Sequence, residues 1–441
     1  MPAAPADSAI YRTLLGDDAV AALFTDAAEV RAMMLVEGAL ARAQGDLGVI
    51  PADAAGFLHR ASLELQIDPG ALATETARNG VPVPALIAAF RKAAQAPEMT
   101  QWLHWGATSQ DIVDTALALR LRRVIEVWDG RLAALLARLA DLAEAHADLP
   151  MAARTYGQLA TPTGFGAQVA SWGRPLLRHR ARLAALRADV LRVSLSGAAG
   201  TLSAMGTQGP AVRARLAELL ALGDPGASWH AERDGMAALS GWMAGLAGTL
   251  AKMGEDLILL TQGGLAEVAL AGAGGSSTMP QKQNPVGPSA MVALSRQVTG
   301  LSAVLSGAGA HRQMRDGAAW FTEWLVLPQM AISTARALAL ADQAAQGLVP
   351  DPVAMRRALQ ADGGAVMAEA VSFALAAHLP RPEAQARVTA LCDEARRSGA
   401  DLAALAARDW PQIDWQAVLG AGMLGTAPDE ARAFAQAVRA G

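Results

Sequence analysis

The sequence predicts an all-α protein whose centre is a bundle of long helices. Its composition is 52% hydrophobic but only 4% aromatic, with many Ala and Leu residues. Ala and Leu are good helix formers, whereas strands favour β-branched and aromatic residues. No segment alternates polar and apolar residues over a sustained run, and no hairpin dipeptide joins two β-rich runs. We therefore expect helices throughout.

The spacing of apolar residues predicts the individual helices. The stretch that begins at Arg31 carries an apolar face at three- and four-residue spacing and is closed by Gly48 and Pro51. The stretch that begins at Arg131 carries a narrow leucine seam typical of helices that pack lengthwise. The first face consists of Met33, Val36, Leu40, Ala43 and Leu47, and the seam of Leu132, Leu135, Leu139 and Leu142. Further helices are expected around 165–195, 210–222, 235–262, 286–309, 325–347 and 382–398.

Two loops suggest where domains meet. PEMTQWLHWGATSQD, from Pro97, ends a first helical region, and GLVPDP, from Gly347 to Pro352, opens a last one. We therefore expect an N-terminal helical domain over 1–110, a central long-helix bundle over 111–350 and a C-terminal helical domain over 351–441.

Charge and cysteine content limit the partners and the compartment. The net charge is −4 and there is no basic run, so nothing favours nucleic acid or an anionic membrane as partner. The longest uncharged stretch, 235–251, is shorter than the roughly 20 apolar residues of a membrane-spanning helix. The single cysteine, Cys392, cannot form an internal disulfide, and the N-terminus lacks the pattern of a secretory signal. We expect a soluble cytoplasmic protein.

The first of three polar islands in this apolar chain is LHWGATSQDIVDTA, from Leu103 to Ala116. Thr108 is followed three residues later by Asp111, the pattern of a capping box. Thr108 and Ser109 would then lie at a helix N-terminus, where unpaired N–H groups and the helix dipole favour an anion. Alternatively, their hydroxyls only cap the helix, which is a common role for such residues.

The other two islands are also loops. ARTYGQLATPTGFG, from Ala153 to Gly166, places Thr155, Tyr156 and Gln158 before a Pro/Gly turn, and by itself it is also compatible with a plain polar turn. GGSSTMPQKQNPVGPSAM, from Gly274 to Met291, combines glycines, which allow close backbone approach, with donors that suit carboxylate oxygens. A Gly/Ser loop is usually a linker, but this one continues directly into MPQKQNP and then a helix.

Together the islands resemble the active-site segments of the fumarase/aspartase superfamily. GSSTMPQKQNP, from Gly275 to Pro285, is similar to its signature loop, and HWGATSQD and RTYGQLATP resemble its other two segments in the expected order. LVEGALARAQGDLGVIP, SWHAERDG and MRDGAAWFTEW are similar to further family segments, and the stretch from Gly363 resembles the third domain of the cycloisomerase branch. The resemblance implies a three-domain helical subunit and a homotetramer with active sites shared between subunits.

The superfamily's chemistry is proton transfer next to a carboxylate, which gives an enediolate that needs positive charge and hydrogen-bond donors. By resemblance, Ser276 carries the proton, and Lys282 and Asn284 contact the carboxylate. His104 would orient the substrate or donate to it, although a structural histidine in a polar loop is equally compatible with the sequence. The implied catalytic residues are Ser276, Lys282 and His104, and the implied substrate-binding residues are Thr108, Ser109, Thr155, Tyr156, Gln158, Ser277, Asn284 and Arg315.

Tyr156 is the informative departure from the family pattern. Lyases of the superfamily that release an amine carry a histidine at this position, which works in the acid step. A carboxylate, whose parent acid has a pKa of about 4, leaves without a proton. The tyrosine therefore favours the cycloisomerase branch, in which a carboxylate of a small tricarboxylate adds to a double bond of the same molecule. The alternatives are a lyase acting on an adenylosuccinate-like substrate and a non-catalytic helical scaffold.

The sequence predicts no metal and no nucleotide cofactor. It contains no HExxH or paired-Cys spacing and no GxGxxG or GxxxxGK[ST] loop. Four histidines are interpreted as surface or packing residues: His59, His146, His179 and His378. We expect His230, in SWHAERDG, to have no catalytic role.

Overall fold

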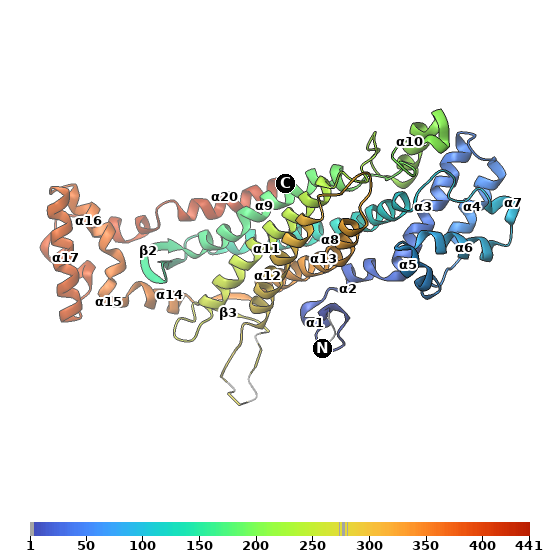
Figure 1. Cartoon of the computed structure of the whole chain (residues 1–441). Helices are drawn as coiled ribbons and strands as arrows, with labels where there is room; N and C mark the ends of the chain where they lie inside the picture. The colour runs from blue at the N-terminus through green and yellow to red at the C-terminus, as the bar shows by residue number, and fades with distance from the viewer. Residues whose placement is uncertain (1–3, 273, 276–277, 280) are drawn as a thin grey trace. The chain divides into compact units, whose positions relative to one another are not determined.

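The computed structural model describes residues 4–272, 274–275, 278–279 and 281–441, and within them the chain is helical apart from short strands (Figure 1). The all-α prediction with long central helices is confirmed. By its internal contacts the chain divides into two units. Unit 1 comprises 1–130, 179–248 and 293–337, and unit 2 comprises 131–178, 249–292 and 338–441. The three domain boundaries expected from the sequence stay a prediction.

Five long helices contribute residues to both units, and unit 1 adds a set of shorter helices. The long helices are α8 (Ser109–Ala145), α9 (Phe165–Val190), α11 (Asp234–Leu260), α12 (Val286–Gly307) and α13 (Gly317–Gln346). The shorter ones are η1 (Pro5–Asp7), α1 (Arg12–Leu15), α2 (Asp18–Ala21), η2 (Ala22–Phe24), α3 (Asp26–Asp46), α4 (Ala52–Glu64), η3 (Pro69–Leu72), α5 (Ala73–Asn79), α6 (Val83–Ala94), α7 (Pro97–Thr100), η4 (Ser203–Gln208) and α10 (Gly209–Leu220).

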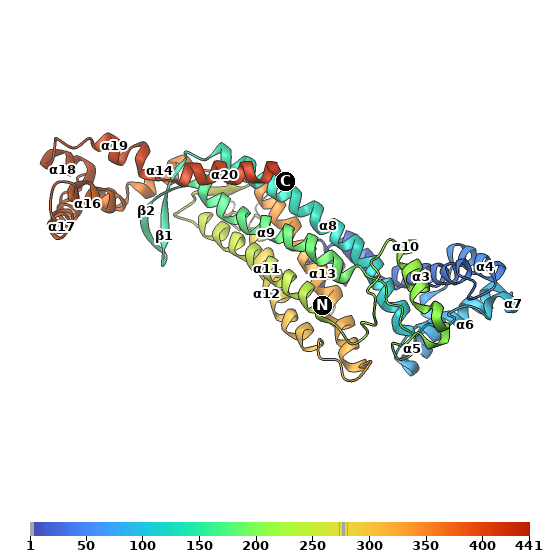
Figure 2. The same ribbon diagram turned by 90° about the horizontal axis from the view of Figure 1, so that it is seen from above.

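Helices α3 and α4 pack closely against each other in unit 1 and lie side by side in both ribbon views (Figures 1 and 2). A methyl group on Gly38 of α3 would lie 1.9 Å from the hydroxyl oxygen of Ser62 on α4, so only glycine allows this approach. The apolar face predicted for α3 is buried from Met33 to Ala43. Two polar side chains, Glu37 and Gln44, are buried on the same helix.

Helix α8 contains both the end of the first polar island and the leucine seam, which the sequence analysis treated as separate segments. It begins at Ser109, directly after the capping-box threonine, and continues through Gly130 into the leucine seam. Leu132, Leu135 and Leu139 are fully buried, as expected for helices that pack lengthwise. Helix α13 begins at Gly317, earlier than the expected start near 325.

Unit 2 contains two antiparallel strand pairs that the sequence analysis did not predict, which corrects the expectation of helices throughout. Strands β1 (Pro150–Thr155) and β2 (Gln158–Gly164) form a hairpin, and β3 (Val268–Leu270) pairs with β4 (Leu348–Pro350) (Figure 2). The hairpin turn is Tyr156-Gly157, with φ values of 52° and 75°. Two left-handed residues are what a two-residue hairpin turn requires, but tyrosine rarely adopts that conformation and gave no signal.

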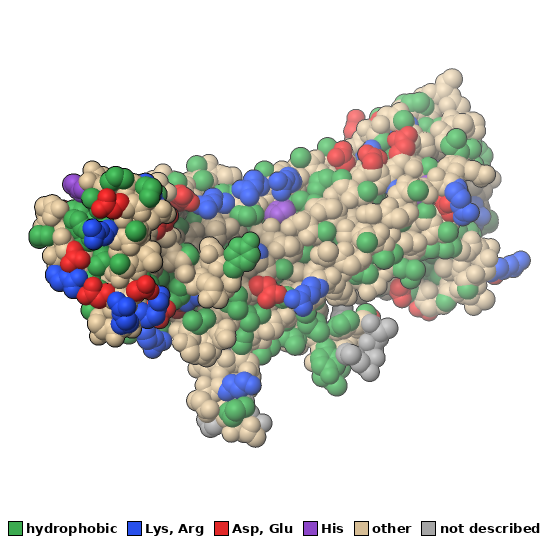
Figure 3. All heavy atoms as spheres, turned by 60° about the vertical axis from the view of Figure 1, so that its left-hand side comes forward, with side chains coloured by type: hydrophobic (Ala, Val, Ile, Leu, Met, Phe, Trp, Pro, Cys, Tyr) green, Lys and Arg blue, Asp and Glu red, His purple; other side chains and the backbone are tan. Residues whose placement is uncertain are grey.

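Among the C-terminal helices of unit 2, those over 368–376, 381–398 and 402–409 pack around an apolar cluster that includes Val371, Leu375, Leu391 and Leu402. Their outer surface alternates arginines with acidic side chains (Figure 3), and Arg408 pairs there with Glu394 at 2.6 Å. The C-terminal helices are α14 (Pro352–Leu359), α15 (Ala361–Gly364), η5 (Ala365–Met367), α16 (Ala368–Ala376), α17 (Arg381–Ser398), α18 (Leu402–Asp409), α19 (Trp415–Leu419), η6 (Ala421–Leu424) and α20 (Ala427–Ala440).

Among the helices of the described residues, one, α13, is long and apolar enough to cross a bilayer by length and composition alone. Its most apolar window is 61% buried within the protein, and the core helix of a soluble protein passes the same test. The helix is therefore weak evidence for a membrane span.

Candidate active site

The first polar island forms the N-terminus of α8, as its capping-box pattern predicted. The carboxylate of Asp111 is fully buried and accepts a hydrogen bond from the backbone N–H of Thr108 at 3.0 Å. The hydroxyls of Thr108 and Ser109 have no hydrogen-bond partner in the described part of the chain. Asp111 therefore performs the capping, and the two hydroxyls stay available to a ligand at the positive end of the helix dipole.

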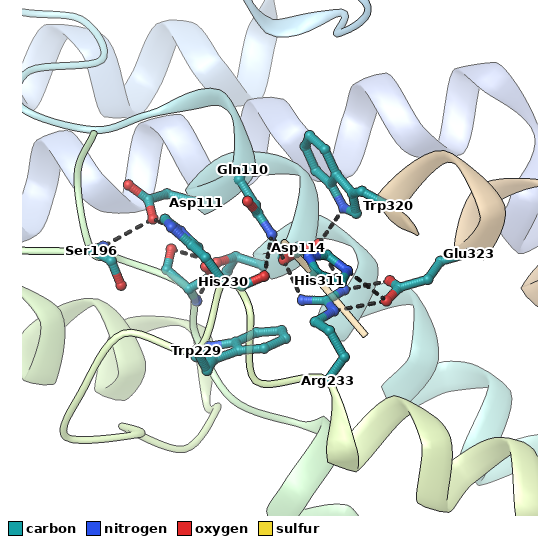
Figure 4. A network of polar contacts seen from close by, with 12 residues as sticks. Gln110, Asp111, Asp114, Ser196, Trp229, His230, Arg233, His311, Trp320 and Glu323 are labelled. Carbon is teal, nitrogen blue, oxygen red and sulfur yellow. Dashed lines mark hydrogen bonds and ion pairs between the residues drawn. The ribbon is translucent and has the colours of Figure 1, made fainter. Parts of the chain in front are cut away.

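Asp111 also anchors a second segment beside this helix end. Its two carboxylate oxygens accept hydrogen bonds from the backbone N–H groups of Ser196 at 2.9 Å and Gly197 at 3.0 Å. The ring nitrogen Nε2 of His230 lies 2.7 Å from the same carboxylate (Figure 4). His230 is buried and its Nε2 is paired with Asp111, so in this structure it stabilises the carboxylate that anchors Ser196 and Gly197. The absence of a catalytic role stays a prediction.

His104 is fixed by a buried carboxylate. Its Nδ1 lies 2.7 Å from Oε1 of Glu37, which α3 contributes from the apolar core. Burial alone would lower the pKa of His104, but the charge and the hydrogen bond of Glu37 outweigh it. The pKa of His104 is therefore raised above its usual 6.5, which favours the cationic imidazolium beside the helix end.

Arg315 reaches the same region from the segment that precedes α13. Its guanidinium donates a hydrogen bond to the carbonyl of Ala198 at 3.1 Å. Ala198 follows Gly197, which is held by Asp111. Unit 1 thus connects Arg315 with the Thr108 and Ser109 helix end through one short segment.

Sequence analysis missed the charge network buried next to this site. Arg233, the residue before α11, lies between Asp114 of α8 and Glu323 of α13, with a 2.7 Å bond to Asp114 and a 2.8 Å bond to Glu323 (Figure 4). Trp320 and Gln110 donate further hydrogen bonds to Asp114 at 3.0 and 3.1 Å. The available signal was that SWHAERDG and MRDGAAWFTEW, which contain Arg233 and Glu323, resemble family segments, but a local segment does not reveal how its charged residues pair.

The second island is the tip of the β1–β2 hairpin in unit 2. Thr155 and Gln158 are register partners on either side of the turn, and the Tyr156 side chain is fully exposed. Gln158 lines an open hollow of about 860 Å³ in this unit. Of the cations in its wall, Arg154 and Lys252 are paired with Glu267 and Asp256, whereas Arg357 donates to the backbone carbonyl of Leu265.

The third island is the loop between β3 and α12. Its base is closed by two backbone hydrogen bonds between Gly274 and Asn284, at 3.0 and 2.8 Å. Lys282 is exposed on this loop. Ser276 and Ser277, to which the sequence assigns the proton and a substrate contact, lie outside the described residues. The three islands therefore lie on separate elements, one in unit 1 and two in unit 2.

Within the part of the chain that the structure describes, no group of three or more His, Cys, Asp or Glu side chains is arranged to hold a metal ion. What the described residues of unit 1 offer instead is a set of hydrogen-bond donors: the hydroxyls of Thr108 and Ser109, the imidazole of His104 and the guanidinium of Arg315. Donors and cations of this kind suit carboxylate groups.

Comparison with known proteins supports this chemistry. A family model described as lyase matches residues 16–300. The chain is 40% identical to the 3-carboxy-cis,cis-muconate cycloisomerase of Pseudomonas aeruginosa, over 87% of this chain and 85% of the relative, and 39% identical to that of Bradyrhizobium diazoefficiens, over 86% and 85%. The crystal structure of the 3-carboxy-cis,cis-muconate lactonizing enzyme from Pseudomonas putida superposes with a TM-score of 0.91 at 33% identity, covering 98% of this chain and 99% of that one.

Proposed function

Because the chain belongs to the lyase family within the fumarase/aspartase superfamily, we propose that it acts as a 3-carboxy-cis,cis-muconate cycloisomerase. The reaction is the reversible addition of a substrate carboxylate to a double bond of the same molecule, forming 4-carboxymuconolactone in protocatechuate degradation. We place it in the cytoplasm. The observation that carries the proposal is the helix end of α8, where two uncommitted hydroxyls lie close in sequence to His104, which is paired with Glu37.

The bond changes explain why this arrangement suits the reaction. An oxygen of one carboxylate forms a C–O bond with a carbon of the double bond. The electron pair of that double bond moves to the carbon next to another carboxylate, which becomes an enediolate. A proton taken up at this carbon completes the lactone, so three negative charges become two. The growing charge on the enediolate is what fixed donors stabilise.

Each donor of the site has a part in this scheme. Thr108 and Ser109 bind one carboxylate at the helix N-terminus, and His104 adds a charged N–H. Lys282 and Asn284 bind the carboxylate that becomes the enediolate, and Ser276 transfers the proton. The remaining contacts to the tricarboxylate come from Thr155, Tyr156, Gln158, Ser277 and Arg315.

Tyr156 favours lactone chemistry over amine release. In the reverse reaction the leaving group is a carboxylate, which needs no proton near neutral pH because its parent acid has a pKa of about 4. A phenol with a pKa near 10 is a poor substitute for the histidine that protonates a leaving amine. The fully exposed side chain at the hairpin tip is available to a ligand or to another subunit.

We also propose a homotetramer in which the islands of different subunits complete each site. Large apolar side chains are exposed on three of the long helices, Leu259 on α11, Val304 on α12 and Leu325 on α13. Packing of these long helices against those of other subunits would bury the exposed apolar side chains. Light scattering tests the tetramer. Mixing two impaired variants, Thr108→Val and Ser276→Ala, tests the sharing of sites, because mixed tetramers with shared sites should exceed the average activity of the two separate variants.

Ultraviolet absorbance tests the reaction, because lactone closure destroys the conjugated diene of the muconate. We expect absorbance to fall with the wild-type protein and hardly to change with Ser276→Ala. Lys282→Met should lower kcat about 100-fold or more, the usual cost of removing one donor to a developing oxyanion. Lys92→Met, the same change at an exposed lysine of α6, is the matched control and should keep wild-type kcat.

Adenylosuccinate is tested in parallel to separate the alternatives. Cleavage of adenylosuccinate with the muconate untouched would keep the family and overturn the argument from Tyr156. Activity on neither compound would favour the scaffold. A Ser276→Ala variant with wild-type rate would remove the proton-transfer role from the signature loop.

A further inference from the structure

Glu37 is an unusual residue for its position. It lies on α3 with 1% of its surface exposed, on the same helix as Met33, Val36 and Leu40 of an apolar core of unit 1. Oε1 pairs with Nδ1 of His104, and Oε2 is buried without a hydrogen-bond partner among the described residues. A buried carboxylate is costly unless it is paired. Within the described parts of the chain, the ion pair with His104 is therefore the interaction that compensates this charge.

The backbone at His104 is held in a strained conformation. Its φ is +63°, in the left-handed region that residues other than glycine rarely adopt. A second buried side chain of α3, Gln44, lies two turns after Glu37 and donates a hydrogen bond to the carbonyl of Trp105 at 2.7 Å. Strain of this kind persists where surrounding structure enforces it and is concentrated at functional sites.

The contacts leave one ring nitrogen of His104 uncommitted. Nδ1 faces Glu37, whereas Nε2 has no hydrogen-bond partner in the described part of the chain, and 21% of the side chain is exposed. A carboxylate on Nδ1 fixes which nitrogen a histidine offers to a ligand. The ring thus presents Nε2–H on its accessible side, four residues before the uncommitted hydroxyl of Thr108.

We propose that Glu37 is a positioning residue for the reaction: it orients His104 and pairs with its charge, so that Nε2–H donates to a carboxylate of the substrate. This inference rests on the proposed function, because the proposed substrate supplies the carboxylate that accepts the hydrogen bond from His104. Glu37 itself does not touch the substrate. Gln44 holds the same loop but contributes no charge.

Three charged groups act on His104 besides its burial. Burial lowers the pKa of His104, Glu37 of α3 raises it by charge and hydrogen bond, Asp111 of α8 raises it further, and Arg91 of α6 lowers it. The net direction is upward. A donor role for the imidazolium is therefore fully present at low pH and is lost as pH rises through the raised pKa. Removing the charge of Glu37 must move this loss to lower pH.

The variant that tests the inference is Glu37→Gln, which keeps the shape and a hydrogen-bond acceptor but removes the charge. The matched control is Gln44→Met, which breaks the other contact from α3 to this loop without changing any charge. Two measurements are made on the full-length protein: the pKa of His104 by NMR with labelled histidine, assigned with His104→Gln, and the pH profile of kcat/KM for the muconate.

We expect Glu37→Gln to lower the pKa of His104 by about one unit or more, as an adjacent opposite charge typically shifts a pKa by 1–3 units. The alkaline limb of the pH profile of kcat/KM should move to lower pH by the same amount. On that limb Glu37→Gln should be about tenfold less active than wild type, and at low pH the two should be equally active. Gln44→Met should leave the limb in place and change kcat/KM by the same factor at every pH.

Several results would overturn the inference. One is a His104 pKa at or below 6.5 in the wild-type protein, a result that can be obtained even if Glu37→Gln does not fold. Another is a pH limb that moves no further in Glu37→Gln than in Gln44→Met. Failure of the proposed function gives a different pattern: the muconate stays unchanged with wild type at every pH, while the NMR titration still measures whether Glu37 holds the charge of His104.

Discussion

Removal of Arg233 should destabilise the protein far more than removal of a surface arginine. Arg233 is 1% exposed, and its partners Asp114 and Glu323 are 1% and 2% exposed. The substitution Arg233→Met keeps an unbranched side chain of similar length but leaves two buried carboxylates without their common cation. Because a buried ion pair that loses one partner costs about 3–5 kcal/mol, we expect a loss in the free energy of unfolding near the upper end of that range.

Two features of the site limit the loss. Asp114 keeps its hydrogen bonds from Gln110 and Trp320. Glu323 can become neutral: burial raises its pKa, and in the wild-type protein the hydrogen bond from Arg233 reverses this and holds the pKa below its usual 4.5. The stabilising contribution of Glu323 is therefore present above pH 4.5 and is lost as pH falls. The destabilisation caused by Arg233→Met should accordingly shrink on acidification.

The assay is urea unfolding followed by tryptophan fluorescence, with wild type and variants at one fixed protein concentration. Arg408→Met is the matched control, because Arg408 also bonds two carboxylates, Glu394 and Asp409, but is 52% exposed. Exposed pairs contribute about 0–1 kcal/mol. If Arg233→Met and Arg408→Met differ by less than about 1 kcal/mol near neutral pH, the reasoning from burial is refuted.

Two further predictions concern the helix end of α8 and the packing of unit 2. Thr108→Val should change the free energy of unfolding by less than about 0.5 kcal/mol, because Asp111 rather than the Thr108 hydroxyl caps the helix, whereas kcat/KM for the muconate should fall about tenfold. A stability loss near 1 kcal/mol in the same urea assay would identify the hydroxyl as a cap. Gly166→Ala should destabilise by about 1–3 kcal/mol, because the added methyl would lie 2.4 Å from the backbone carbonyl of Ala143. Gly130→Ala on α8, where the methyl meets nothing within 4 Å, should be neutral or stabilising, and equal losses in both variants would contradict the packing argument.

The sequence predicted the helices well because helix periodicity is a local property. The apolar face of α3, the start of α8 at the Thr108 and Asp111 box and the leucine seam were all visible as short spacings. The β1–β2 hairpin was missed for an equally local reason. Its turn places Tyr156 in a left-handed conformation that tyrosine rarely adopts. The turn therefore lacks the Asn or Gly residues by which a hairpin is usually predicted.

The sequence by itself determined the fold class, the positions of the three islands and the chemical types of their side chains, because these depend on residues close together in the chain. Only the tertiary structure decided which polar groups are committed and which are free. Asp111 takes the capping role and leaves the Thr108 hydroxyl available, and Glu37, 67 residues before His104, gives that histidine its orientation and charge. Such pairings join residues distant in sequence, and their strength depends on burial, which no local pattern encodes.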